Sequence, residues 1–115
     1  MPTATLVHQG DRIDYTPAPG SDVAVGAVVV QGDLIGIANR PIPANTLGAL
    51  EVTGVFDVPK ATGASTAIAA GVKVYWDVAD QQAKADSETG ANKYLGKTVL
   101  AAVDADTTVR VRLEQ

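Results

Sequence analysis

The sequence predicts an all-β protein, either a small, partly closed β-barrel or a sandwich, with about eight or nine short strands. Apolar and polar residues alternate in several short runs, which is the period of a half-buried strand. The 11 glycines and 6 prolines interrupt these runs at short intervals. No segment has a useful helical period: residues 64–70, the most alanine-rich run, stop at Gly71 and predict one or two turns at most.

Length and composition limit the number of domains the chain can form and the classes of partner it can bind. The 115 residues suffice for one core, so we expect a flexible arm over residues 1–10 and a single β-domain over residues 11–115. The absence of cysteine excludes disulfides and thiolate metal sites. The net charge of −4 argues against a nucleic-acid partner, and no apolar run is long enough to cross a membrane. The first residues lack the regions of a secretory signal, so we expect a protein used without export.

The N-terminal segment differs from the rest of the chain. Residues 1–9 are short, polar and threonine-rich, and besides the first methionine only Leu6 and Val7 are large and apolar. Such a segment predicts either a frayed terminus or an arm that becomes ordered against a partner.

The next elements are predicted strands. Residues 12–15 alternate and predict a strand. A turn-rich loop with two prolines follows, and residues 27–31 and 34–38 then predict a tight hairpin around Gly32-Asp33. Three consecutive valines at 28–30 indicate that both faces of this strand are covered.

The centre of the chain holds the best strand signals. Residues 50–56 alternate and predict one strand with a bulge or kink at Gly54. We expect Pro59 and Lys60 to lie past the end of its regular pattern, because proline cannot donate to a sheet ladder. A second strand is predicted over residues 72–76.

The last third is predicted to hold a loop and two strands. Residues 78–93 are polar and predict an exposed hairpin or a mobile loop. Residues 94–103 and 107–113 form the last predicted strand pair. In its final strand Arg110 and Arg112 point away from an apolar row, which suits either a solvated face or an interface.

The two halves of the chain show a weak internal duplication. Residues 23–30 align with residues 68–76, and each segment has a turn glycine that leads into a strand. A further glycine, Gly36 or Gly96, then enters an apolar strand. Each copy ends on an alternating strand, at residues 50–53 and 109–112. This pattern predicts two similar β-units closed against each other, with residues 78–93 inserted in the second.

No segment indicates an enzyme. Residues 90–98 resemble a phosphate-binding loop, but five residues separate the glycines where the motif requires four. His8 is the only histidine and lies in the N-terminal segment, which disfavours a zinc site or a catalytic triad. The carboxylates fall in turns, and the sequence does not single out any two of them as a catalytic acid and base. We therefore expect no catalysis, no metal and no cofactor.

Tyr75 and Trp76 are adjacent on a predicted strand, so their side chains point to opposite faces. One should lie in the core, and the other is then available for a subunit contact, where aromatic residues are enriched. The candidate subunit-interface residues are Tyr75, Trp76, Arg110 and Arg112.

Several motifs of the chain resemble the family of small tailed-phage capsid cement, or head decoration, proteins. They are Gly54-Val55-Phe56, Pro59-Lys60, Ile68-Ala-Ala-Gly71 and Val74-Tyr75-Trp76-Asp77, with residues 10–17 and 23–26 before them and 107–113 after them. The resemblance implies a structural protein of a phage or prophage. It would be made in the bacterial cytoplasm and would bind the outer surface of the head through the major capsid protein. It also implies a homotrimer, with capsid-contact candidates in the arm at Thr3, Thr5, Leu6 and Val7.

Two other functions compete with this hypothesis. A small β-barrel binding module for a carbohydrate or protein ligand would want an aromatic platform, but aromatic residues are only 4% of the chain. A nucleotide-dependent recombination factor would need a phosphate-binding loop, and the spacing of the glycines before Lys97 does not match that motif.

Overall fold

The computed structural model describes residues 4–115, and this part of the chain folds into nine strands arranged in two antiparallel sheets. The first sheet has the order β1-β4-β3-β2 and the second the order β5-β9-β8-β6-β7. The first sheet comprises β1 (Arg12–Tyr15), β2 (Val28–Gln31), β3 (Leu34–Ile37) and β4 (Gly48–Glu51). The second comprises β5 (Thr53–Pro59), β6 (Lys73–Asp77), β7 (Gln82–Lys84), β8 (Lys93–Thr98) and β9 (Thr108–Glu114), with a 3₁₀ helix, η1 (Glu88–Gly90), between β7 and β8.

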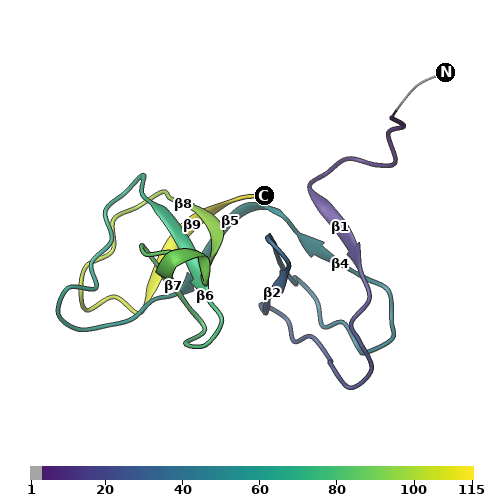
Figure 1. Cartoon of the computed structure of the whole chain (residues 1–115), viewed down its shortest axis with the longest axis horizontal. Helices are drawn as coiled ribbons and strands as arrows, with labels where there is room; N and C mark the ends of the chain where they lie inside the picture. Colours follow the sequence, from purple (N-terminus) through teal and green to yellow (C-terminus); the bar gives the residue numbers. More distant parts are fainter. Residues whose placement is uncertain (1–3) are drawn as a thin grey trace.

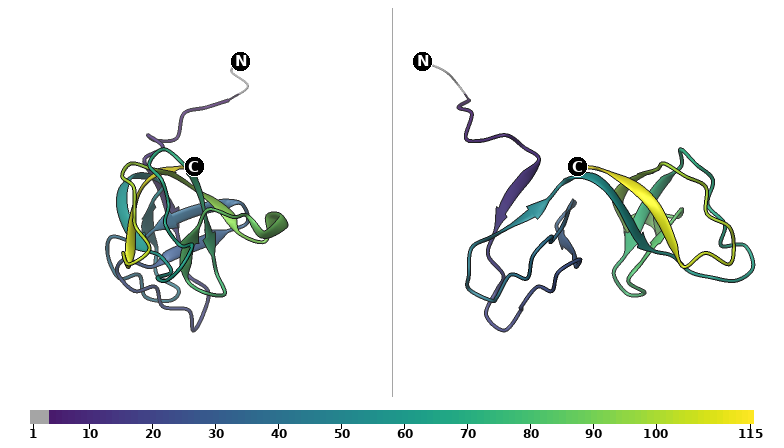
Figure 2. Two further views of the ribbon diagram at one scale, coloured as in Figure 1. Left: turned by 90° about the vertical axis from the view of Figure 1, so that its left-hand side faces the viewer. Right: turned by 180° about the vertical axis from the view of Figure 1, so that it is seen from behind.

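The two sheets form two lobes along a molecule 53 Å long (Figure 1). We call residues 11–52 the first lobe and residues 53–115 the second lobe. The chain passes directly from β4 into β5, and its C-terminus returns to this junction (Figure 2). A single parallel bridge joins Lys60 to Ala83, beside the edge strands β5 and β7, but neither sheet closes into a barrel within the described residues. The all-β prediction is confirmed, and the architecture is sandwich-like.

The lobes share a core. Ile35 and Ile37 of β3 pack in one cluster with buried residues of the second sheet, among them Leu95 and Leu113. Gln115 reinforces this contact, since its Oε1 accepts from the backbone N–H of Ile35 at 2.8 Å and its Nε2 donates to the carbonyl of Leu95 at 2.9 Å. A separate, smaller cluster on the other face of the first sheet centres on Ala38, Ile42 and Leu50.

The strand orders support the predicted duplication. Without β7, the second sheet has the order β5-β9-β8-β6, which repeats β1-β4-β3-β2 strand for strand. The loops repeat as well, because an isolated antiparallel bridge joins Val23 to Ile42 in the first lobe and Ile68 to Ala102 in the second. The inserted residues supply β7 and η1.

Gly36 and Gly96 occupy corresponding places in the two lobes, and each allows two neighbouring strands to approach unusually closely. A Cβ at Gly36 would lie 2.6 Å from the Cβ of Leu50, and a Cβ at Gly96 would lie 2.0 Å from the carbonyl oxygen of Arg112. Both distances are below van der Waals contact, so β3 against β4 and β8 against β9 require glycine at these positions.

The predicted single strand over residues 50–56 is wrong. It is two strands, β4 and β5, that belong to different sheets and meet at Val52, whose N–H donates to the carbonyl of Asp11. Gly54 lies inside β5 with a φ of 117°. The strand also continues through Pro59, because β5 pairs with β9 alone and an edge strand tolerates a proline.

The inserted segment is more ordered than its polarity predicted. Residues 82–84 form β7, which pairs with β6, and Ala83 is buried in the core. Lys84 also lies 2.8 Å from the carboxylate of Asp77 on β6. The hairpin is therefore confirmed, but it is part of the sheet and not only an exposed loop. Residues 64–70 contain no helix.

Lys60 is a buried cation that holds two loops together. It is 4% exposed, and its Nζ donates to the carbonyls of Ala61 at 2.7 Å and Asp106 at 3.1 Å and to Oγ1 of Thr66 at 3.3 Å. The carboxylate of Asp104 strengthens the same contact by accepting from the N–H of Thr66 at 3.1 Å. Lys60 thus stabilises the distal end of the second lobe.

Replacing Lys60 with methionine should lower the free energy of unfolding by about 2 to 4 kcal/mol, because it removes three charge-assisted hydrogen bonds to partly buried oxygens. Chemical denaturation measures the change. Lys73→Met is the matched control, since Lys73 is exposed, and it should change stability by less than about 0.5 kcal/mol. Equal stabilities for the two variants would contradict the role of Lys60.

Candidate interaction site

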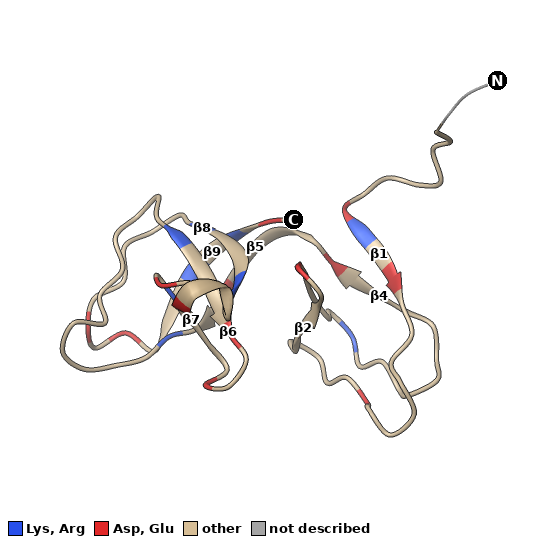
Figure 3. Cartoon of the chain, in the orientation of Figure 1, with Lys and Arg blue, Asp and Glu red and all other residues tan. Residues whose placement is uncertain are grey.

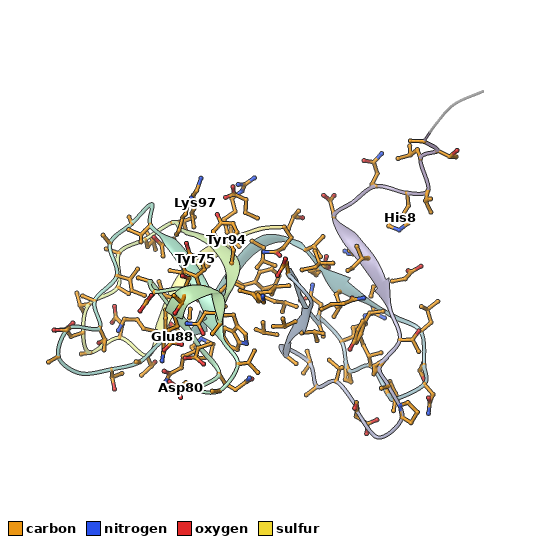
Figure 4. The ribbon with its side chains drawn as sticks, in the orientation of Figure 1. His8, Tyr75, Asp80, Glu88, Tyr94 and Lys97 are labelled. Atoms are coloured by element: carbon orange, nitrogen blue, oxygen red, sulfur yellow. The ribbon has the colours of Figure 1, made fainter. Side chains whose placement is uncertain are left out.

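The outer face of the second sheet brings together three of the four predicted interface residues. Tyr75 of β6, labelled in Figure 4, lies on this face. Arg110 and Arg112 of β9 lie there too, because they alternate with the buried residues of that strand. Trp76 does not lie there: it is 2% exposed and belongs to the core cluster. The prediction that the two aromatic residues point to opposite faces is confirmed, and Trp76 is unavailable for a subunit contact because its own chain covers it.

Tyr94 adds an aromatic group that sequence reasoning missed. Its ring lies 5.8 Å from that of Tyr75 at an interplanar angle of 62°, and its hydroxyl donates to Glu114 at 3.2 Å. Burial, followed by the Glu114 carboxylate, raises the pKa of Tyr94. A register shift between Val74 and Tyr75 places the two rings opposite each other, and no motif in the sequence announces this shift. The edge-to-face rings do not form one flat platform.

A row of three cations crosses the same face. Lys73 of β6 is the cross-strand partner of Lys97 of β8, and Lys97 is the partner of Arg112 of β9. We call these residues the cation row. Only Lys97 has a carboxylate near it, that of Glu114 at 3.7 Å, whereas Lys73 and Arg112 form no ion pair with any residue between 4 and 115. Figure 3 shows the basic residues of these strands.

The two arginines predicted for the interface differ in whether a carboxylate pairs with them. Arg110 donates to both oxygens of Asp57, from Nε at 2.9 Å and from Nη2 at 3.2 Å. The hydrogen bond from Arg110 lowers the pKa of Asp57. Arg110 is therefore paired within its own chain, whereas the guanidinium of Arg112 makes no ion pair with residues 4–115.

The N-terminal segment offers a second exposed surface. Residues 4–10 form no strand and lead away from the lobes (Figure 1). Leu6 is 78% exposed and Val7 86%, and Thr5 is exposed as well. Thr3 lies outside the described residues. Two large apolar side chains are thus presented without cover from the described part of the chain.

The remaining candidates are placed as follows. Gly96, Lys97 and Thr98 lie in β8, in extended backbone and not in a loop that leads into a helix. His8 is exposed. Across residues 4–115 no three His, Cys, Asp or Glu side chains gather as a metal site would require. None of the described helices is long and apolar enough to cross a membrane.

A family model described as "Phage cement protein" matches residues 7–113 of the 115-residue chain. Neither the curated proteins nor the solved structures contain a significant match.

Proposed function

The chain belongs to the phage cement protein family, whose role is that of a capsid-associated structural protein, and from this premise we propose that it binds the outer surface of an assembled phage head and stabilises it. The protein would be made in the bacterial cytoplasm and end on the exterior of the virion. Its partner there would be the major capsid protein.

The observation that carries this proposal is the exposed N-terminal segment. Leu6 and Val7 are exposed and lie outside any strand, so their backbone groups are available for addition of a strand to a neighbouring sheet. Residues 4–9 would act as the capsid-binding arm. Ordering such a segment costs roughly 1 to 2 kcal/mol per residue in backbone entropy, so one arm binds weakly.

A homotrimer overcomes this cost. Three arms on one particle bind the capsid together, because the second and third bind at a high effective concentration once the first is engaged. Weak contacts then add up to stable attachment that bridges neighbouring capsomers.

The experiment mixes the purified protein with heads that lack decoration and separates the heads by sedimentation. We expect saturable co-sedimentation and a rise in the temperature at which the DNA-filled heads release their genome. An acidic β-protein of similar size, added at the same concentration, is the control. If the protein remains in the supernatant with that control, the proposed function is wrong.

A further inference from the structure

The charges of the chain are segregated, with most cations on the second sheet and most acids outside it. The five strands of this sheet carry six cations and three acids, so their net charge is 6 − 3 = +3. The whole chain has 9 cations and 13 acids, so everything outside these strands carries 3 − 10 = −7. The second sheet is thus basic in a chain that is acidic overall.

Ion pairs within the chain account for only half of these cations. Three of the six have a close carboxylate, in the pairs Arg110–Asp57, Lys84–Asp77 and Lys93–Asp33. The other three are the cation row, whose members stand opposite one another on adjacent strands, with only Glu114 near it, at 3.7 Å from Lys97. Like charges at opposite positions destabilise a sheet, and a solvated face normally mixes both signs. Exposure to water therefore does not account for the cation row.

The internal duplication shows how the same face is used in the first lobe. The strand registers of the two sheets correspond, because Val29 is opposite Gly36 in one and Val74 is opposite Gly96 in the other. The three positions of the cation row correspond to Val28, Ile37 and Glu51 in the first lobe. There Val28 and Ile37 pack against the second lobe. This face of the repeated unit is a protein contact in the first lobe, whereas in the second lobe it is exposed.

The side chains beside the cation row are typical of a protein interface. Tyr75 and Tyr94 lie next to Lys97 (Figure 4), and Val55, the cross-strand partner of Arg112, is 55% exposed. Tyrosine and arginine dominate the energetics of protein interfaces. The edge-to-face rings offer no flat surface on which bases could stack, which disfavours a nucleic acid. The partner must be acidic, because the cations would otherwise be buried without a counter-charge.

We propose that the cation row, with Tyr75 and Tyr94, docks on an acidic surface of the major capsid protein on the phage head. The proposal rests on the proposed function and adds a second contact to that of the arm. The arm supplies apolar side chains and free backbone groups, and the cation row supplies charge. Because the rest of the chain carries a net charge of −7, an acidic partner is repelled from its other faces. The cation row thereby fixes the orientation of the protein on the head.

Neutralising the cation row tests the contact. The row variant carries Lys73→Gln, Lys97→Gln and Arg112→Gln, which lowers the net charge from −4 to −7. The control variant reaches the same net charge at exposed positions of the first lobe, with Gln31→Glu, Arg40→Gln and Asn45→Asp. Co-sedimentation with undecorated heads at low and high salt measures the affinity of each protein, and thermal unfolding measures its stability.

The row variant should bind heads about tenfold more weakly than the wild type at low salt, because three surface ion pairs are lost together. Wild-type binding should weaken with salt, and the row variant should lose most of this dependence. The melting temperature of the row variant should equal or exceed that of the wild type, because the repulsion between its strands is removed. The control variant should bind heads as the wild type does.

A row variant that occupies heads as well as the control variant does, or that keeps the full salt dependence, overturns this inference and leaves the proposed function intact. Retention of the wild type but not the row variant on duplex DNA, with normal occupancy of heads by that variant, would assign the cation row to nucleic acid and also overturn the inference. A wild type that does not bind heads at all removes the proposed function together with this contact.

Discussion

Replacing Gly96 with alanine should destabilise the fold by about 3 kcal/mol or more, the upper end of what overpacking costs. The new Cβ would lie 2.0 Å from the backbone oxygen of Arg112, and a backbone atom cannot swing aside as a long side chain can. Relief requires β8 and β9 to separate in the middle of the second sheet. Because small domains are stable by only about 5 to 15 kcal/mol, a large fall in melting temperature or loss of soluble protein is expected.

Two further glycine variants make this result specific. Gly10→Ala adds the same methyl group in open space at ordinary φ, so its melting temperature should match the wild type. Gly36→Ala should be intermediate, since its closest contact, with the Cβ of Leu50, is 2.6 Å and therefore less severe than the 2.0 Å contact at Gly96. Thermal unfolding followed by circular dichroism measures all three. A Gly96→Ala protein as stable as Gly10→Ala would show that the close approach of β8 and β9 is not required.

Deleting residues 2–9 should abolish attachment to undecorated heads and leave thermal stability nearly unchanged. The described part of this segment contributes nothing to either core cluster, so its loss costs the fold little. Attachment should be lost because the proposed contact is multivalent: removing each arm removes a contact, and the binding strength gained by linking them disappears as well. Co-sedimentation with heads gives the occupancy.

A double substitution separates the contribution of the arm's side chains to capsid binding from that of its backbone. Leu6→Ser with Val7→Ser keeps the length of the arm and its backbone groups but removes both exposed apolar side chains. We expect occupancy below a tenth of the wild-type value at the same concentration. If the deleted protein decorates heads normally, the capsid contact lies elsewhere. If it unfolds, the segment is part of the fold.

Periodicity predicted the elements that are regular along the chain. The alternation of Val109, Val111 and Leu113 correctly placed three buried side chains in β9, and the Gly32-Asp33 turn correctly joined β2 to β3. The turn glycines also revealed the duplication, because the same local geometry recurs in both lobes. These signals are local, so they can be read from neighbouring residues.

Structural features that depend on contacts between residues far apart in the sequence were not predictable. The alternation over residues 50–56 continues across Val52, although the strands on its two sides join different sheets. The register shift that brings Tyr94 to Tyr75 depends on how β8 meets β6. Lys60 was expected only to lie past the end of a strand, and its contacts with residues 61, 66 and 106 explain why it is buried. On the outer face of the second sheet, Tyr75, Arg110 and Arg112 were candidates from the sequence, whereas Lys73, Tyr94 and Lys97 were not singled out.

The repeated strand order has a consequence for the history of the protein. A single four-stranded unit would leave Ile35 and Ile37 uncovered, since the second lobe buries them. An ancestor made of one unit would therefore have needed another copy to complete its core. Fusion of two such genes would have replaced this association with a covalent link at Val52, which supplies the second unit at high effective concentration.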